Sequence, residues 1–189
     1  MKNLIIGLTV AAALSLIACS ENNATASEAS TSQAPTTPND ESDDTGAPLN
    51  ADTASKVVQA YSKAVACQLD DSTEYKPVEI RAGDPELDGL GALYLVLWNG
   101  DFGCMGGNAT VLPNFTLVEK RGFSSADPIV VTDYEFPEPS LKVVTDLTVK
   151  DGLIRITGLE VGEDDDMNNP THKATYQIQF DGEKFSKTK

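Results

Sequence analysis

The stretch from Ala92 to Trp98 limits the possible folds of this chain more than any other, because a large apolar side chain occupies every position after Ala92. In an extended strand, successive side chains point to opposite faces of the sheet. The two faces would be Leu93, Leu95 and Leu97 on one side and Tyr94, Val96 and Trp98 on the other. Both faces then need to be covered, so we expect this segment to be the central strand of a sheet.

One helix is predicted, at the start of the globular part. Apolar residues recur there at roughly helical spacing: Val57, Val58, Tyr61, Val65 and Ala66. Asn50 or Asp52 can cap the first turn, and the helical pattern ends near Gln68. We expect this helix to cover one face of the strand at 91–99.

Short β-rich runs, separated by Gly, Pro, Asn or Asp, fill the rest of the domain and predict strands. The runs are 75–81, 91–99, 109–119, 128–135, 141–149, 153–161, 173–180 and 183–187. Sequential strands joined by short turns favour antiparallel pairing. The expected fold class is therefore α+β, with an N-terminal helix packed on a largely antiparallel meander sheet of about six to eight strands.

Two hairpins are predicted from side-chain alternation and turn residues. Apolar and polar residues alternate through 173–180, and Asp181-Gly182 can then supply a turn with positive φ. The other hairpin joins 141–149 to 153–161. The apolar parity of its return strand switches partway along, which predicts a β-bulge at Gly158.

The first nineteen residues have the three parts of a signal peptide. Lys2 supplies a positive charge, and an apolar stretch from Leu4 to Ile17 follows, which is shorter than the roughly 18 residues that span a bilayer. The stretch ends in Leu16-Ile17-Ala18-Cys19, which resembles the lipobox of bacterial lipoproteins. The resemblance implies removal of residues 1–18 and attachment of a diacylglyceryl group and an amide-linked acyl chain such as palmitate to Cys19. An ordinary signal peptide with a coincidental cysteine is the alternative.

Residues 19–49 are interpreted as the lipidated cysteine followed by a tether. From Ser20 to Pro48 there is no aromatic residue, no Lys or Arg, and no Leu, Ile or Val. Such a segment buries too little apolar surface to offset the entropy of ordering, so we expect an acidic, disordered Ser/Thr/Pro tether. By analogy with bacterial lipoproteins, Ser20 in place of Asp after the cysteine implies sorting to the outer membrane of a Gram-negative bacterium.

Residues 50–189 are expected to form a single domain with an acidic surface. This part holds 23 of the 29 acidic residues and 13 of the 14 basic ones, which leaves a net charge near −10. Such a charge disfavours nucleic acid and anionic lipid headgroups, and it favours basic partners or divalent cations. Solubility alone is the alternative explanation.

Two cysteines remain once Cys19 is assigned to the lipid: Cys67 and Cys104. In an oxidising compartment such a pair forms a disulfide. It would join the end of the helix to the segment that follows the central strand. Neither cysteine has a neighbouring His or a C-x-x-C spacing, so a reactive thiol is not supported.

Three loops are candidate ligand sites. The glycine-rich loop after the central strand could form an anion-binding nest or a tight turn held by the disulfide; its residues are Gly100, Asp101, Gly103, Gly106 and Gly107. Two acidic loops could hold Ca²⁺, or be solvated turns; they contain Asp84, Glu86 and Asp88, and Asp164, Asp165 and Asp166. The first begins like an EF-hand loop, but its twelfth position is Leu95 instead of Glu, so no cofactor is expected.

Nothing in the chain indicates catalysis. His172 is the only histidine, and neither a G-x-S-x-G motif nor a set of zinc ligands accompanies it. We therefore expect a non-catalytic envelope lipoprotein that binds a protein or cell-envelope component through its acidic surface, for example by inhibiting a basic cell-wall hydrolase. The alternative is a module that binds a divalent cation or a small ligand, and a hydrolase is the third hypothesis.

Overall fold

The computed structural model describes residues 46–70, 72–107 and 110–188. The predicted signal peptide, Cys19 and the tether up to residue 45 lie outside the described residues. In the part that is described, no helix is long and apolar enough to cross a membrane. The chain joins the domain before residue 50, since Leu49 is buried and its N–H donates to the carbonyl of Asp88.

The predicted helix is present as α1 (Ala51–Val65). Asn50 is its N-cap, with the side-chain oxygen accepting from the N–H of Thr53 over 3.0 Å. The prediction that the helix continues to Gln68 is wrong. The chain becomes extended at Ala66 and forms β1 (Ala66–Leu69), which pairs with the far end of the central strand. Pairing with a distant strand overrides the local helical pattern here.

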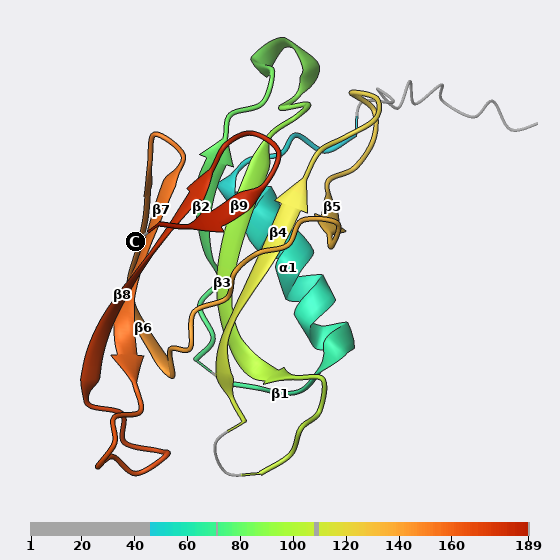
Figure 1. Cartoon of the computed structure of the whole chain (residues 1–189). Coiled ribbons are helices and arrows are strands. Elements are labelled where there is room, and N and C mark those ends of the chain that lie inside the picture. Colours follow the sequence, from blue (N-terminus) through green and yellow to red (C-terminus); the bar gives the residue numbers. More distant parts are fainter. Residues whose placement is uncertain (1–45, 71, 108–109, 189) are drawn as a thin grey trace, which may run out of the picture. The chain divides into compact units, whose positions relative to one another are not determined.

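The first sheet is built around the predicted central strand, β3 (Leu93–Phe102). Along one side of β3 lie β1 and β2 (Lys76–Arg81), and along the other lies β4 (Leu112–Glu119). A short strand, β5 (Ile129–Val131), pairs with β4 and ends the sheet. All of these pairs are antiparallel (Figure 1).

The remaining strands form a second, four-stranded sheet. It is an antiparallel meander of β6 (Val143–Lys150), β7 (Leu153–Glu160), β8 (His172–Phe180) and β9 (Phe185–Lys187). The α+β class is thus confirmed, but one sheet of six to eight strands is wrong: nine described strands divide into two sheets. The reason is that β3 has two apolar faces, and one helix can cover only one of them.

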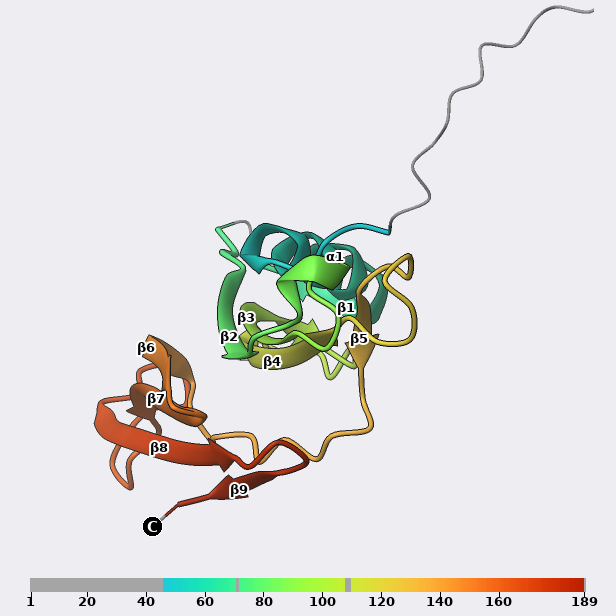
Figure 2. The ribbon, with the colours of Figure 1, turned by 90° about the horizontal axis from the view of Figure 1, so that it is seen from above.

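The two cores show how β3 is covered. On one face, α1 packs with Tyr94, Val96 and Trp98. On the other, Leu93 and Leu95 contact the second sheet. Figure 2 shows the resulting layers, with α1 and the second sheet on opposite sides of the first sheet. The apolar residues contributed by the second sheet and the segment before it are Leu141, Ile154, Ile156, Ile178, Phe180 and Phe185.

Both predicted hairpins are present, with one correction. Asp151 and Gly152, with φ of 51° and 75°, form the two-residue turn between β6 and β7. The extra residue of the bulge lies in β6, at Thr145, and not at Gly158. Gly158 serves another purpose, because a Cβ atom there would lie 2.0 Å from the carbonyl oxygen of Val143. Gly158 therefore lets the two strands approach where β6 bulges.

Candidate functional site

The glycine-rich loop is closed by its own carboxylate. Asp101, only 3% exposed, accepts hydrogen bonds from the N–H groups of Met105 (3.0 Å) and Gly106 (3.2 Å). Gly103, Gly106 and Gly107 all have positive φ, as a turn this tight requires, and Gly100 pairs with Leu112 in the sheet. The N–H groups that a bound anion would need at positions 105 and 106 are already satisfied.

The predicted disulfide is confirmed. Cys67 and Cys104 are bonded, with their Cα atoms 5.1 Å apart. Because Cys67 lies in β1 and not in the helix, the bond joins β1 to the turn after β3, the strand with which β1 pairs. It therefore fixes the position of the loop that follows Cys104.

The two acidic loops are organised by bonds to the backbone. Asp84 accepts from the N–H of Glu86 and starts a 3₁₀ turn, η1 (Pro85–Leu87), which ends at Asp88. In the other loop, Asp164 and Asp166 are exposed while Asp165 points back into the loop. Among the described residues, no group of three or more His, Cys, Asp or Glu side chains is arranged to hold a metal ion.

Asp165 closes its loop by accepting three hydrogen bonds. The donors are the N–H of Gly162 (2.9 Å), the N–H of Thr171 (2.7 Å) and the hydroxyl of Thr171 (2.7 Å). These bonds, that from Gly162 most of all, lower the pKa of Asp165 to about 2. The ionised carboxylate thus holds together the two ends of the β7–β8 loop.

His172 is an exposed residue at the beginning of β8. Its Nε2 lies 3.7 Å from Oε1 of Glu160, the residue opposite it on β7. The other oxygen of Glu160 accepts from the hydroxyl of Tyr176. This places His172 in a surface pair between strands, and the structure shows no serine or cysteine bonded to it in the described part of the chain.

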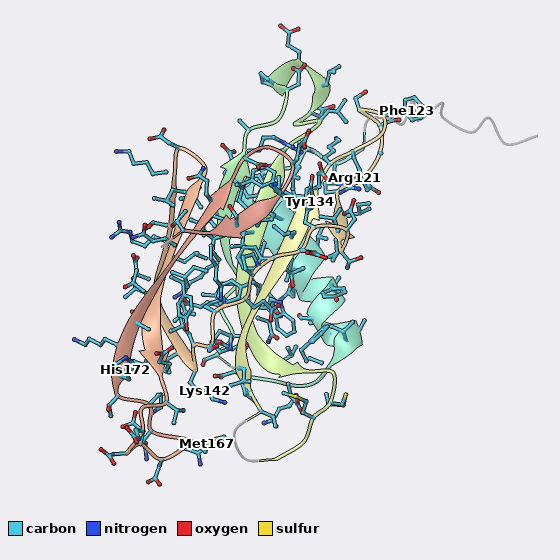
Figure 3. All side chains as sticks on the ribbon, in the orientation of Figure 1. Arg121, Phe123, Tyr134, Lys142, Met167 and His172 are labelled. Carbon is cyan, nitrogen blue, oxygen red and sulfur yellow. A yellow bond between two sulfur atoms is a disulfide. The ribbon has the colours of Figure 1, made fainter. Side chains whose placement is uncertain are left out.

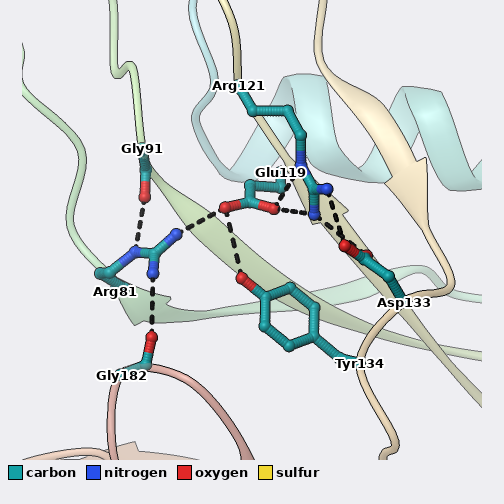
Figure 4. A network of polar contacts seen from close by, with 7 residues as sticks. All are labelled: Arg81, Gly91, Glu119, Arg121, Asp133, Tyr134 and Gly182. Carbon is teal, nitrogen blue, oxygen red and sulfur yellow. Dashed lines mark hydrogen bonds and ion pairs between the residues drawn. The ribbon is translucent and has the colours of Figure 1, made fainter.

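A cluster of charged side chains that the sequence did not predict surrounds the buried Glu119 at the end of β4 (Figure 4), and its other members are partly exposed. Arg81 from β2 and Arg121 both donate to its carboxylate, and Arg121 also binds Asp133. Arg81 reaches the carbonyl of Gly182, in the turn between β8 and β9. The cluster therefore links the two sheets, and the Arg121 guanidinium lowers the pKa of Asp133.

The clearest surface for a ligand is a groove along β4. Strand β5 pairs only with Leu117–Glu119, so the segment from Leu112 to Thr116 has no strand beside it on that edge among the described residues. Three hollows of about 260, 400 and 280 Å³ follow one another there. The first two share Phe102, Asn114 and Glu138, and the second and third share Leu112 and Lys142.

Four large apolar side chains are exposed in this groove, which we call the β4 groove. They are Phe102 (48% exposed), Met105 (67%), Val143 (42%) and Met167 (62%). They come from the end of β3, the loop after it, β6 and the β7–β8 loop, so only the tertiary structure brings them together. Phe102 and Met105 lie within the glycine-rich segment that the sequence analysis selected for its backbone. No pattern in the sequence marks these two side chains as exposed.

The described lining of the β4 groove has one acidic and one basic side chain, and an acidic run adjoins Met167 in the sequence. Glu138 lines two of the hollows, and the loop that carries Met167 also carries the acidic run Glu163–Asp166. Lys142 is the basic residue of the lining. An apolar surface with an acidic run beside it suits a ligand that has both apolar and basic groups.

The fold and the groove together define a three-layer α+β protein with an open apolar groove along β4. Comparisons with protein-family models, with curated proteins and with solved structures found no match to this chain.

Proposed function

We propose that this chain is a non-catalytic lipoprotein of the Gram-negative cell envelope, anchored through Cys19, which binds a protein segment in the β4 groove. The observation that carries the proposal is the exposure of Phe102, Met105, Val143 and Met167 around one set of hollows. Exposed apolar patches with a polar rim are typical of protein interaction sites.

The apolar side chains supply the affinity in this proposal. Burial of apolar surface contributes about 25 cal/mol per Å², and the four side chains are exposed in the free protein. Methionine is unbranched and adapts to irregular partner surfaces, so Met105 and Met167 suit a groove that accepts a loop or an extended segment.

The charge of the domain selects a basic partner. Acidic residues exceed basic ones by about ten in residues 50–189, and Glu163, Asp164 and Asp166 are exposed beside Met167. Opposite charge around an interface speeds association and disfavours acidic competitors. A basic cell-wall hydrolase held by such a groove would be inhibited, which is the specific form of the proposal.

The edge of β4 favours insertion of side chains over addition of a strand. Lys120 forms its backbone bonds with Gly91 and Ala92, on the β3 side. In an antiparallel ladder, the backbone N–H and C=O groups of successive residues point alternately to the two neighbouring strands. The backbone groups of Pro113 and Phe115 therefore point to the open edge of β4. Pro113 has no N–H to donate, which is a common way in which proteins protect sheet edges from pairing.

The test compares two sets of variants of the full-length lipidated chain in envelope extracts. Met105→Asp with Met167→Asp changes the β4 groove at two exposed positions. Leu87→Asp with Ile129→Asp makes equal changes at exposed apolar residues that line none of the three hollows, and is the matched control.

We expect the wild type and the control to retain a basic envelope protein and the groove variant to lose it, with binding of the purified pair weakened at least about tenfold. Equal retention by all three chains would show that the β4 groove is not the binding surface. Retention of acidic proteins only would contradict the basic partner.

A further inference from the structure

The chain enters the domain beside the loop between β4 and β5. The N–H of Ala47 donates to Oδ1 of Asp127 over 3.1 Å, and the buried Lys120 donates from Nζ to the carbonyl of Ala47 over 2.9 Å. Gly46 lies against the backbone of Ser125, where a Cβ atom would be 2.2 Å from the carbonyl oxygen. These contacts fix the point at which the N-terminal segment leaves the domain.

Phe123 lies at the tip of this same loop and is 82% exposed, more than any other large apolar residue of the described chain. Figure 3 shows its side chain at the end of the loop. Burying a phenylalanine side chain is favourable because it removes apolar surface from water, and no described part of the domain supplies that burial. The exposed ring therefore points to something outside the domain.

The tip of this loop carries no charged residue; the exposed carboxylate of Asp127 follows it and accepts from the N–H of Ala47. Gly122 to Ala126 reads Gly-Phe-Ser-Ser-Ala. Of the two basic residues before it, Lys120 is buried and Arg121 is bound to Glu119 and Asp133. The chain as a whole has a net charge of −15, but this tip is uncharged. Such a tip suits a surface without net charge that has an apolar layer beneath its polar groups. A zwitterionic lipid surface meets this description, whereas anionic lipid would be repelled by the protein as a whole.

The lipid anchor at Cys19 would keep the loop that carries Phe123 within reach of a bilayer. Residues 20–45 separate Cys19 from Gly46, and a chain of this length reaches at most about 90 Å. Attachment at Cys19 would hold the domain near the bilayer, so a weak contact by one aromatic ring is enough to bias its orientation.

We propose that the loop Gly122–Ala126 contacts the bilayer that holds Cys19, with Phe123 entering the boundary between lipid headgroups and acyl chains. This inference rests on the lipid anchor of the proposed function. Phe123 and Met167 lie at opposite ends of the domain (Figure 3). The contact would therefore direct the end of the β4 groove that contains Met167 away from the membrane, toward its protein partner.

The test places a tryptophan at one end of the domain or the other. The full-length chain is produced with its own anchor and reconstituted into phosphatidylcholine vesicles that contain a lipid with a doxyl quencher. Phe123→Trp reports on the loop and Met167→Trp, also exposed, is the matched control. The wild type corrects for Trp98, which is buried.

We expect the fluorescence of Phe123→Trp to be lost to the quencher and that of Met167→Trp to be unchanged. Equal quenching at both positions, or none at position 123, would overturn the proposed contact. Hydrogen exchange tests the native ring: amides 122–126 should exchange more slowly on vesicles in the wild type than in Phe123→Ser, and equal rates would also overturn it.

A separate arm distinguishes failure of the contact from failure of the anchor. Mass spectrometry of the N-terminal peptide shows whether Cys19 carries acyl chains, and an unmodified Cys19 overturns the anchor. In that case, the thiol of Cys19 is joined to a maleimide phospholipid, and the quenching measurement still decides whether Phe123 contacts the bilayer.

Discussion

Arg81 donates from Nη2 to Oε1 of Glu119 over 2.6 Å, and this ion pair joins neighbouring layers of the molecule because Arg81 also binds the carbonyl of Gly182. The side chain of Glu119 is 7% exposed. A buried carboxylate of this kind stabilises a fold only while its cationic partners remain in place.

Replacement of Arg81 by Ala is expected to lower the free energy of unfolding by about 3 kcal/mol, because Glu119 loses one of its two guanidinium partners and stays buried. Denaturant unfolding measures the change. Lys56→Ala is the control, because both side chains of the Lys56–Asp52 ion pair are exposed to solvent. The free energy of unfolding should fall by less than about 1 kcal/mol in this variant. Equal effects of the two substitutions would contradict the role given to Arg81.

The β7–β8 loop is expected to open in acid. The pKa of Asp165 is lowered to about 2 in the folded protein, against 3.8 for a free aspartate. A lowered carboxyl pKa contributes stability that is fully present above the unfolded value and is lost as the pH falls through the folded value. The hydrogen bonds to Gly162 and Thr171 should therefore persist at pH 5 and break between about pH 4 and pH 2.

The amide signals of Gly162 and Thr171 in NMR spectra provide the measurement for this loop. In Asp165→Asn the acid transition of both amides should disappear, whereas Asp164→Asn, at a neighbouring exposed position, should leave it unchanged. A transition that survives in Asp165→Asn would assign it to another group.

Loss of the disulfide is expected to weaken both the fold and the β4 groove. The bond closes a loop with a sequence separation of 37, for which the chain-entropy model gives about 4 kcal/mol. Replacing both Cys67 and Cys104 by Ser should lower the free energy of unfolding by about that amount and speed hydrogen exchange at Met105 and Gly106. Unchanged exchange would show that Asp101 alone holds the loop.

Gly158→Ala is expected to destabilise the second sheet strongly. The added Cβ would lie 2.0 Å from the carbonyl oxygen of Val143, so β6 and β7 must separate, at a cost above about 2 kcal/mol. Gly182→Ala is the comparison, because Gly182 has φ of 105° but no atom within 4 Å of the added Cβ, and strain alone costs about 1 kcal/mol. Thermal unfolding of the two variants should rank them in this order.

Several elements could be predicted from the sequence because they depend on local patterns. Alternation of side chains identified β3 as a strand with two buried faces, and the turn residues located the β6–β7 hairpin. The Cys67–Cys104 bond followed from the number of cysteines once Cys19 was set aside. The end of α1 could not be predicted, because β1 forms only when the end of β3 lies beside it.

Some residues of the candidate sites could be predicted from the sequence, and others could not. The acidic and glycine-rich loops were visible in the sequence, but their carboxylates bind backbone N–H groups of their own loops, as Asp101 and Asp165 show. The β4 groove was not visible, because Phe102, Val143 and Met167 are far apart in the chain and each is a single exposed apolar residue. Exposed apolar residues that stand alone in a sequence carry no signal of a patch.

By itself, the sequence determined where most strands other than β1 run, which face of β3 each side chain occupies, and that both faces must be buried. The tertiary structure alone decided that the strands divide into two sheets, that Glu119 joins them, and that β4 keeps an open edge. The physical reason is that side-chain periodicity is a property of neighbouring residues, whereas strand pairing depends on contacts between distant ones. In this chain the segment from Thr132 to Lys142, which includes Pro137 and Pro139, connects the last strand of the first sheet to the first strand of the second.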